Sequence, residues 1–454
     1  MAWDKRHGNI LKKILTRFNE NNIKYFILRN YKGLPNINPS KDVDIIVNPL
    51  FIKEAKNILK EVYIEDEITS YYEIRFAYVH CCHGMDINTE IGIHIDIIGS
   101  YVSKGFEIFT FDEMYIYTEK YNELRVLNKF FEGVMVFIYK QFNYRPILKK
   151  EYQEIIYNTH KQYPEFKELI SKLVGSQLAE KIFLQIENKD FDKMLAYSND
   201  LTNALKRFAR KKSLLKTFKY TLEFYWDKLN RIVFRYSKYS KVFSVMAPDG
   251  AGKTTFIDAL LEKIDFYFVN DKNDNRCNVY HFRPNILPNL GELGEKAGIK
   301  EQDKDFTNPH RAKPANRLSS LVRIGYYWLD YVIGFNVLVR KDVQYDRFSV
   351  FDRYSYDLLV DPTRTRLNLP MWVRKIFVKC MPHPKVVFYL DASPDVIYKR
   401  KQELTLDEIT RQNKLYKEVA SSNKRFITLD SNRPVNESVD DAIKIILENF
   451  TVKL

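Results

Sequence analysis

The sequence predicts an α/β protein with a small α/β domain, a helical connector and a doubly wound parallel-sheet domain, in that order. Three observations predict this class. The chain has 454 residues with 45% apolar content, which is too much for one ordinary core. Residues 120–235 show helical apolar spacing almost throughout, and from residue 241 apolar runs alternate with helical patterns. The expected domains span residues 1–120, 121–240 and 241–454.

The N-terminal part mixes short β-rich runs with a helical stretch at 50–62. The runs are YFILRNY, DVDIIV and EIGIHIDIIG. Asp42 and Asp44 alternate along one expected strand, so both carboxylates project from one face, about 7 Å apart along the chain. Asp96 has similar apolar flanks on a later strand. Three converging carboxylates would hold one or two Mg²⁺ ions and activate a hydroxyl that attacks a nucleotide α-phosphate.

This pattern resembles the nucleotidyltransferase superfamily, in which a Gly-Ser turn precedes a DxD pair and a third Asp lies on a neighbouring strand. The resemblance implies metal binding at Asp42, Asp44 and Asp96. In place of the Gly-Ser turn this chain reads LRNYKGLP, so either the substrate geometry differs or the domain has lost catalysis. Arg29 and Lys140 are weaker candidates for phosphate contacts, with a solvated surface role as the alternative for each.

The segment HCCHG begins at residue 80 and contains four possible metal ligands. Four ligands in immediate succession cannot surround one tetrahedral zinc ion, and no second cluster lies nearby in the sequence. We therefore expect an ordinary strand edge or turn here. The cysteines form no disulfide framework and no apolar run is long enough to span a bilayer, so the sequence predicts a cytoplasmic protein.

The connector carries much of the positive charge. Residues 201–240 hold eleven Lys or Arg and two acidic residues, a net charge of +9 out of the total of +14. We first expect an amphipathic helix that packs between the domains. Peripheral contact of residues 201–240 with an anionic membrane is the main alternative, and nucleic acid is not an expected partner. The oligomeric state is left open.

From residue 241 onward, five apolar runs separated by helical patterns predict buried parallel strands. They are KVFSVM, NVYHF, FSVFDRY, KVVFYLD and RFITLD. After the first run, residues 247–254 fit the pattern GxxxxGK[ST] except that Ala247 replaces the first glycine. Gly250 and Gly252 let backbone N–H groups curl around a phosphate, while Lys253 reaches terminal phosphates and Thr254 ligates Mg²⁺.

Two later segments supply further groups for phosphoryl transfer. Asp352 and Arg353 end the third run, where a carboxylate could hold Mg²⁺ and a guanidinium could bind an acceptor phosphate. Arg400, Lys401 and Arg411 lie around a polar turn between two expected helices, as in a mobile lid.

Residues 241–454 resemble the thymidylate kinase family through PDGAGKTT, FDRY and LDASPDVIYKR. The resemblance implies ATP and Mg²⁺ as cofactors, Asp352 near the metal, Arg353 on the acceptor phosphate, and Arg400 and Arg411 over the γ-phosphate. The nucleotide-binding segment is then Asp249, Gly250, Ala251, Gly252, Lys253, Thr254 and Thr255. Asp249 would contact an acceptor hydroxyl, and because Ala251 is not an arginine the catalytic cation should come from the lid.

Departures from that family widen the choice of acceptor. The second run leads only to Arg283 beside Pro284, and YDLLVDPTRTR after the DRY element exceeds what a dTMP enzyme needs. Asp330 lies in an apolar helix, where we expect an ion pair with Arg323 or another basic residue, or else a role in substrate recognition. Similar thymidylate kinase-like chains occur among bacterial surface-polysaccharide proteins.

We therefore expect ATP- and Mg²⁺-dependent phosphoryl transfer to a small acceptor, either a nucleoside monophosphate such as dTMP or a sugar or phosphate intermediate, with nucleotidyl transfer by the N-terminal domain as an added activity. One alternative is a nucleotidyltransferase whose P-loop domain binds ATP as a regulatory module. The other is a non-catalytic nucleotide-binding scaffold in surface-polysaccharide assembly.

Overall fold

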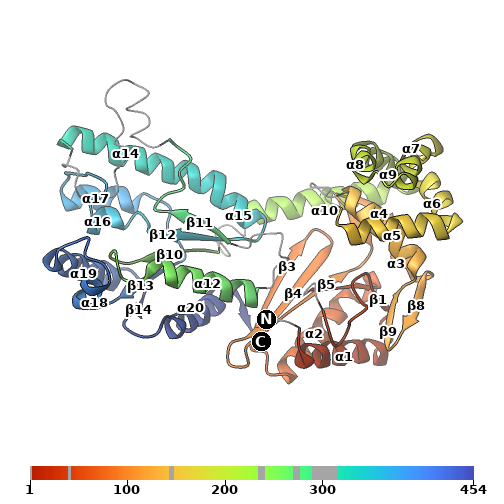
Figure 1. The fold of residues 1–454 in the computed structure, drawn as a ribbon, viewed down its shortest axis with the longest axis horizontal. Helices are drawn as coiled ribbons and strands as arrows, with labels where there is room; N and C mark the ends of the chain where they lie inside the picture. The colour runs from red at the N-terminus through yellow and green to blue at the C-terminus, as the bar shows by residue number, and fades with distance from the viewer. Residues whose placement is uncertain (1–2, 39–41, 143–147, 234–240, 269–276, 289–314) are drawn as a thin grey trace. The chain divides into compact units, whose positions relative to one another are not determined.

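The computed structural model describes residues 3–38, 42–142, 148–233, 241–268, 277–288 and 315–454 (Figure 1). The chain divides into two compact units. Unit 1 comprises Met1–Leu229 together with Val452–Leu454, and unit 2 comprises Asn230–Thr451. Each unit combines helices with a sheet, so the expected α/β class is confirmed at this level.

Unit 1 is built on an eight-stranded mixed sheet with the order β15-β3-β4-β5-β2-β1-β9-β8. The strands are β1 (Tyr25–Ile27), β2 (Asp42–Val47), β3 (Ser70–Phe76), β4 (Val79–Asp86), β5 (Ile91–Ile98), β8 (Thr118–Tyr121), β9 (Leu124–Leu127) and β15 (Val452–Lys453). A separate hairpin joins β6 (Tyr101–Ser103) and β7 (Phe106–Phe109).

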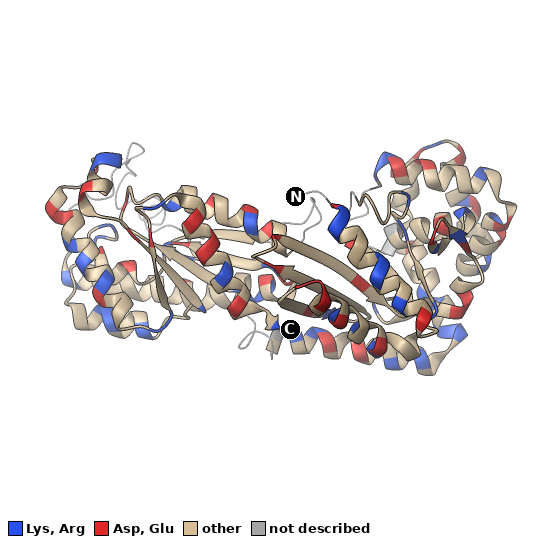
Figure 2. Ribbon diagram, turned by 90° about the horizontal axis from the view of Figure 1, so that it is seen from below, with Lys and Arg blue, Asp and Glu red and all other residues tan. Residues whose placement is uncertain are grey.

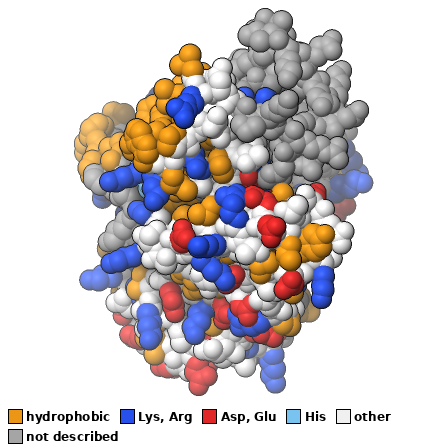
Figure 3. All heavy atoms as spheres, turned by 90° about the vertical axis from the view of Figure 1, so that its left-hand side faces the viewer, with side chains coloured by type: hydrophobic (Ala, Val, Ile, Leu, Met, Phe, Trp, Pro, Cys, Tyr) orange, Lys and Arg blue, Asp and Glu red, His pale blue; other side chains and the backbone are white. Residues whose placement is uncertain are grey.

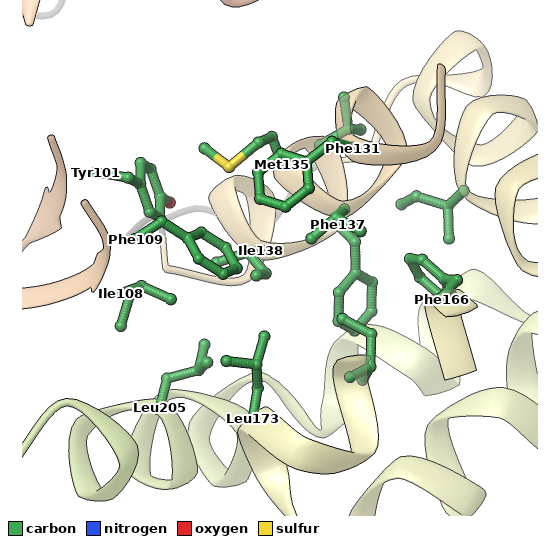
Figure 4. Close-up of a cluster of buried hydrophobic side chains, with 14 of the residues drawn as sticks. Tyr101, Ile108, Phe109, Phe131, Met135, Phe137, Ile138, Phe166, Leu173 and Leu205 are labelled. Atoms are coloured by element: carbon green, nitrogen blue, oxygen red, sulfur yellow. The ribbon is translucent and has the colours of Figure 1, made fainter. Parts of the chain in front are cut away.

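Both faces of this sheet are covered by helices. Because side chains alternate along each strand, a single strand contributes residues to the core on each face. Val43, Ile45 and Val47 of β2 face a core shared with helices α1 (Lys5–Glu20) and α2 (Ile52–Glu65). Ile46 faces the opposite way, into a second core that contains residues of the following helices (Figure 4). These are α3 (Phe111–Tyr115), α4 (Lys129–Phe142), α5 (Lys150–Gln162), α6 (Pro164–Val174), α7 (Ser176–Glu187), α8 (Phe191–Ala196) and α9 (Ser198–Lys212).

The HCCHG segment lies inside β4, between β3 and β5. The expectation of a strand edge or turn is therefore wrong. A turn is expected from the sequence because the segment lacks the continuous apolar run typical of an inner strand. In β4, alternation places Cys81 and His83 on one face of the sheet and Cys82 on the other.

Helix α10 (Leu214–Val233) continues the helical region beyond α9. The apolar spacing predicted across 201–233 has two different outcomes. Leu201 and Leu205 are buried, whereas Phe218, Leu222 and Trp226 are exposed. Among the described residues, no helix is both long and apolar enough to cross a bilayer.

Unit 2 contains a five-stranded parallel sheet with the order β11-β12-β10-β13-β14. The five strands match the five predicted runs: β10 (Val242–Met246), β11 (Cys277–His281), β12 (Phe348–Asp352), β13 (Val386–Asp391) and β14 (Phe426–Asp430). The chain moves from β10 toward one side of the sheet and later crosses to the other, so the order reverses at β10. Ligands of such sheets bind beyond the carboxyl ends of the strands at this point.

Helices cover both faces of the parallel sheet (Figure 1). On one face α12 (Lys253–Tyr267) packs beside α20 (Val435–Phe450). The other face carries α14 (Arg317–Gly334), a π-helical segment (Phe335–Val339), α15 (Arg340–Gln344), α16 (Asp357–Val360), α17 (Met371–Lys379) and α19 (Leu406–Ser421). The short helix α18 (Pro394–Arg400) follows β13.

The surface of the described residues is mixed in character. Acidic and basic residues are interspersed along helices of both units, so the described residues show no single basic face in this view (Figure 2). On unit 2, apolar side chains gather over part of the face in Figure 3. Exposed apolar residues of α14 and α17 include Leu318, Val322, Trp372 and Ile376.

Candidate functional site

The loop between β10 and α12 is the centre of the candidate site in unit 2. Gly250 and Gly252 have φ values of +89° and +85°, a region in which residues with a Cβ are strained. Gly252 is also the N-cap of α12, and in the described chain no side chain caps this helix start. The backbone N–H groups of the first turn are therefore directed toward the end of the sheet, where an anion is favoured.

Neighbouring segments hold this loop closely. A Cβ on Gly250 would lie 2.9 Å from Cβ of Lys401, which follows α18. The Ser431 hydroxyl, just after β14, donates a 2.8 Å hydrogen bond to the carbonyl of Ala251. A pocket of about 240 Å³ opens beside the loop. Its lining comprises Gly252, Thr255, Phe256, Arg400, Ser431, Arg433, Val435 and Ser438.

Lys253 and Asp352 form an ion pair at the carboxyl end of the sheet, with Nζ and Oδ1 3.1 Å apart. His281, at the end of β11, lies 3.0 Å from the other carboxylate oxygen of Asp352. Burial raises the pKa of Asp352, but the His281 hydrogen bond and the Lys253 charge outweigh it and bring the pKa to about 2. Burial, and then the charge of Arg353, lower the pKa of Lys253.

A second charged group lies next to this pair. Asp249 binds Arg353 through one oxygen and Arg364 through the other, the latter at 2.7 Å. Arg353 is 2% exposed and also pairs with Asp357 at 2.7 Å, and Asp357 accepts a 2.6 Å hydrogen bond from Tyr416. Burial raises the pKa of Asp249, but the Arg353 and Arg364 charges hold it well below its usual range.

The predicted site residues of unit 2 lie in several different surroundings. Asp249, Gly250, Ala251, Gly252, Lys253, Thr254 and Thr255 form the loop and the start of α12, with both threonines exposed. Asp352 joins Lys253, whereas Arg353 is enclosed by two carboxylates.

The two expected lid arginines lie in different surroundings. Arg400 ends α18, and its Nη1 would lie 3.7 Å from a Cβ on Gly252. Arg411, on α19, pairs with Glu408 at 2.6 Å and donates to the carbonyl of Val360 at 3.2 Å. Of the two lid arginines, Arg400 is therefore the one beside the loop.

The buried carboxylate expected in the 285–345 region has a basic partner. Asp330 is fully buried and pairs with Arg283 at 3.0 Å, rather than with Arg323. It also accepts backbone hydrogen bonds from Asn285 and Leu287, at 3.1 and 2.7 Å. This network anchors the segment after β11 to α14, which favours the structural interpretation of Asp330. Residues 289–314 lie outside the described part of the chain.

The donor set at the loop suits a magnesium–nucleotide. The left-handed glycines let the loop backbone curl so that its N–H groups can face a phosphate. At Gly250 the missing Cβ also allows close packing against Lys401, whereas at Gly252 the nearest atom to a Cβ would be Arg400 Nη1, at 3.7 Å. Thr254 and Asp352 offer the hydroxyl and carboxylate oxygens that Mg²⁺ prefers. Arg400 adds positive charge to the pocket lining. The charge of Arg433, which also lines the pocket, is balanced by Asp441 at 2.6 Å.

The three carboxylates of unit 1 also converge. Asp44 lies opposite Asp96 in the parallel pairing of β2 with β5, and oxygens of Asp42, Asp44 and Asp96 lie within 4.8 Å of one another. Burial and the Asp44 charge raise the pKa of Asp42. Burial also raises the pKa of Asp96, but the charge and hydrogen bond of His94 lower it overall.

Arg29 lies within this group, since its Nε donates a 2.6 Å hydrogen bond to Asp44. Its guanidinium also stacks over the ring of Tyr139, 4.6 Å from the centroid. The solvated surface role is therefore wrong for Arg29. The side chain of Lys140 lies outside the described atoms.

Three residues in these sites had no role assigned from the sequence. Arg364 lies in the segment YDLLVDPTRTR, which departs from the thymidylate kinase pattern, and this departure could have indicated a functional residue there. His281 ends a predicted strand, so the sequence could have predicted its position at the carboxyl end of the sheet. His94 lies two residues before Asp96 on the same strand face, which alternation predicts.

Comparison with known proteins adds no family assignment, because no family model and no curated protein matches this chain.

Proposed function

We propose that unit 2 transfers the γ-phosphoryl group of ATP to a small acceptor, with Mg²⁺ as the cofactor. The acceptor class is a nucleoside monophosphate such as dTMP, or a sugar or phosphate intermediate. One observation carries the proposal: a loop with two left-handed glycines joins the central strand to an uncapped helix, beside a partly buried lysine–aspartate pair.

The residues of this chain divide the work of phosphoryl transfer. Backbone N–H groups from Gly250 to Thr254 would hold the phosphates, and Lys253 would neutralise the terminal ones. Thr254 and Asp352 would hold Mg²⁺, which supplies further charge neutralisation when bound. The pocket beside Gly252 would receive the nucleoside, with Arg400 above the phosphates.

Asp249 and the two arginines that pair with it, Arg353 and Arg364, are the candidates for binding the acceptor. Arg353 is neutralised by Asp249 and Asp357, so it positions Asp249 more than it attracts an anion. Arg364 is more accessible, with 22% of its side chain exposed. Arg364 is therefore the better candidate to bind an acceptor phosphate, while Asp249 would orient the attacking hydroxyl.

The resemblance to the thymidylate kinase family supports the same assignment. Its three motifs lie at the ends of β10, β12 and β13, which are neighbouring parallel strands. Residues at the carboxyl ends of such strands meet at one edge of the sheet.

Measuring ADP production with a panel of mononucleotides and sugar phosphates tests the proposal. Lys253→Ala should lower turnover by at least about 100-fold, because a charge opposite the transferred group is lost. Lys263→Ala is the matched control: Lys263 lies on the same helix and pairs with Asp440 at the surface. Equal turnover in the wild type and Lys253→Ala would contradict the kinase assignment.

A second candidate function, nucleotidyl transfer by unit 1, is favoured by the convergence of Asp42, Asp44 and Asp96. These residues would hold Mg²⁺ near a nucleotide α-phosphate. Asp42→Asn should abolish pyrophosphate release and leave ADP production intact. If instead turnover survives Lys253→Ala but fails in Asp42→Asn, unit 2 is a regulatory module. If neither change alters phosphate release, the scaffold alternative is favoured.

A further inference from the structure

A second set of metal-binding side chains lies beside the carboxylates of unit 1. Ligand atoms of Cys81, His94 and Asp96 lie within 4.8 Å of one another. Cys81 stands directly opposite Asp96 in the antiparallel pairing of β4 with β5. His94 is two residues before Asp96 on β5, so the three side chains share one face of the sheet.

The three side chains are enclosed but not sealed. Cys81 and His94 are 7% and 6% exposed, whereas 15% of the Asp96 side chain is accessible. His94 Nε2 lies 2.8 Å from Asp96 Oδ1. The ring of His83 stacks on His94 with centroids 3.9 Å apart, which fixes the orientation of the imidazole.

The donor types select the class of metal. Thiolate and imidazole favour zinc and related transition metals, whereas Mg²⁺ prefers oxygen ligands alone. Bonds of about 2.0–2.3 Å in a tetrahedral zinc site separate the ligand atoms by about 3.3–3.8 Å. The three ligand atoms lie within 4.8 Å of one another, and His94 Nε2 and Asp96 Oδ1 are 2.8 Å apart, so side-chain movements of about an ångström would bring them to these separations.

We propose that unit 1 binds a zinc ion through Cys81 Sγ, His94 Nε2 and a carboxylate oxygen of Asp96. Three protein ligands leave one position open for water or substrate. Asp96 also belongs to the carboxylate group with Asp42 and Asp44, so it would link the zinc to a neighbouring Mg²⁺. The proposal goes beyond phosphoryl transfer and does not depend on unit 2.

Metal analysis of the full chain tests this proposal. After dialysis against zinc, the wild type should retain about one zinc per chain, and a cobalt-loaded sample should show a thiolate-to-cobalt charge-transfer band. Cys81→Ser and His94→Gln should each weaken zinc binding by at least about tenfold. Cys380→Ser, which changes an exposed cysteine of unit 2, should bind zinc like the wild type.

Thiol alkylation of the wild type removes any dependence on how the variants fold. Zinc should protect Cys81 from a small alkylating reagent, while exposed Cys380 reacts equally with and without zinc. Failure of zinc to protect Cys81, absence of the cobalt charge-transfer band, or unchanged affinity in Cys81→Ser would each overturn the proposal.

An independent set of observations concerns the exposed face of α10. Leu215, Phe218, Leu222, Trp226 and Leu229 recur at helical spacing and are 85%, 70%, 56%, 58% and 46% exposed. The opposite face packs on unit 1: Tyr220 meets Tyr78 edge to face, and Asp227 accepts a hydrogen bond from the Ala77 backbone.

Basic residues border this apolar face. Lys219 lies on one side of it and Lys228 on the other, both exposed. Lys212 and Lys216, nearby, pair instead with Glu113 and Glu107 of unit 1. An apolar face with lysines along both borders matches the interfacial zone of an anionic bilayer, where apolar side chains enter the acyl boundary and cations meet headgroups. We infer that α10 lies in the plane of an anionic membrane surface.

Vesicle co-sedimentation of the full chain tests this second inference. The wild type should bind vesicles that contain phosphatidylglycerol and bind phosphatidylcholine vesicles weakly, with less binding at high salt. The double change Leu222→Glu/Trp226→Glu should reduce the bound fraction at least tenfold. Trp372→Glu, a change of another exposed tryptophan, should bind like the wild type.

Three results would overturn the membrane assignment. They are no binding to anionic vesicles at low salt, equal binding by the double variant, and a wild-type dimer in ultracentrifugation that the double variant abolishes. The last result would identify a second copy of the chain as the occupant of the α10 face.

Discussion

Arg353 shows how a single enclosed cation organises the candidate site of unit 2. Its guanidinium lies between Asp249 and Asp357, and its backbone has a left-handed φ of 72° that non-glycine residues rarely adopt. Strained residues of this kind are often found at functional sites. The two carboxylates that surround Arg353 fix the position of Asp249.

Asp357→Asn should therefore be strongly destabilising. The change leaves the buried Arg353 charge with half of its compensation, and breaking a buried ion pair lowers the free energy of unfolding by about 3 kcal/mol. Urea denaturation measures this loss. Asp395→Asn, at an exposed position on α18, should change it by less than about 0.5 kcal/mol, and similar values for both variants would contradict the argument.

The Asp352 carboxylate should make stability depend on pH in the acid range. Its pKa falls from an ordinary 3.8 to about 2 in the folded protein. The unfolded state therefore binds the proton first, so the stabilisation is complete above pH 4 and is lost as the pH falls toward 2.

His281→Gln should shrink this acid-dependent loss, because the variant removes the hydrogen bond from His281 that lowers the pKa of Asp352. The measurement is the urea midpoint of both proteins between about pH 5 and pH 2. Parallel curves for the two proteins would show that the hydrogen bond does not matter.

The sequence could predict the positions of site residues that follow directly after a strand, but not those of the others. Lys253 and Asp352 follow apolar runs of parallel strands, so their meeting could be predicted. The meeting of Cys81 with Asp96 could not, because it depends on the register of β4 against β5, which the sequence pattern leaves undetermined.

At the scale of elements, the glycine loop before α12 has a sharp steric requirement. Gly250→Ala forces a Cβ into a left-handed backbone and to within 2.9 Å of Lys401. We expect a loss of about 1–2 kcal/mol in unfolding free energy and weaker ATP binding by calorimetry.

Gly325→Ala is the matched control for that change. Gly325 lies within α14, and a Cβ there meets no atom within 4 Å. Alanine should stabilise this helix by about 0.5–1 kcal/mol. If both alanine variants shift the unfolding free energy in the same direction, the steric account of the loop is incorrect.

Element prediction succeeded where burial on both faces gives a strand a continuous apolar run. The three inner strands of unit 2, β10, β12 and β13, are of this kind. The edge strands β11 and β14 are partly exposed, yet their apolar runs also predict strands. Strands β3 and β4 carry His, Cys, Glu and Arg, so they resemble loops in composition. For α10 the first expectation is a face packed between domains and the alternative is a face on a membrane. The sequence could not choose between them, because apolar periodicity does not say what covers a face.

At the scale of the whole molecule, the two compact units are not consecutive in the chain. Unit 2 is inserted before the last three residues of unit 1, and β15 pairs with β3 in the sheet of unit 1. The three-part division expected from composition stays a prediction, since it rests on patterns and not on contacts.

Deleting residues 452–454 should loosen unit 1 and spare unit 2. The deletion removes the antiparallel pairing of Val452 with Tyr71 and of Lys453 with Ser70. Hydrogen exchange should accelerate in β3, while β10 and β12 remain protected. Faster exchange in unit 2 with no change in β3 would contradict the strand assignment.

This return of the chain has a practical consequence for dissecting the protein. A cut near residue 229 does not yield two self-sufficient fragments, because the N-terminal fragment would lack the strand that borders β3. A fusion partner or purification tag appended after Leu454 would start at the rim of that same sheet. Additions at the C-terminus would therefore disturb unit 1, although most of unit 1 is formed by the N-terminal half of the sequence.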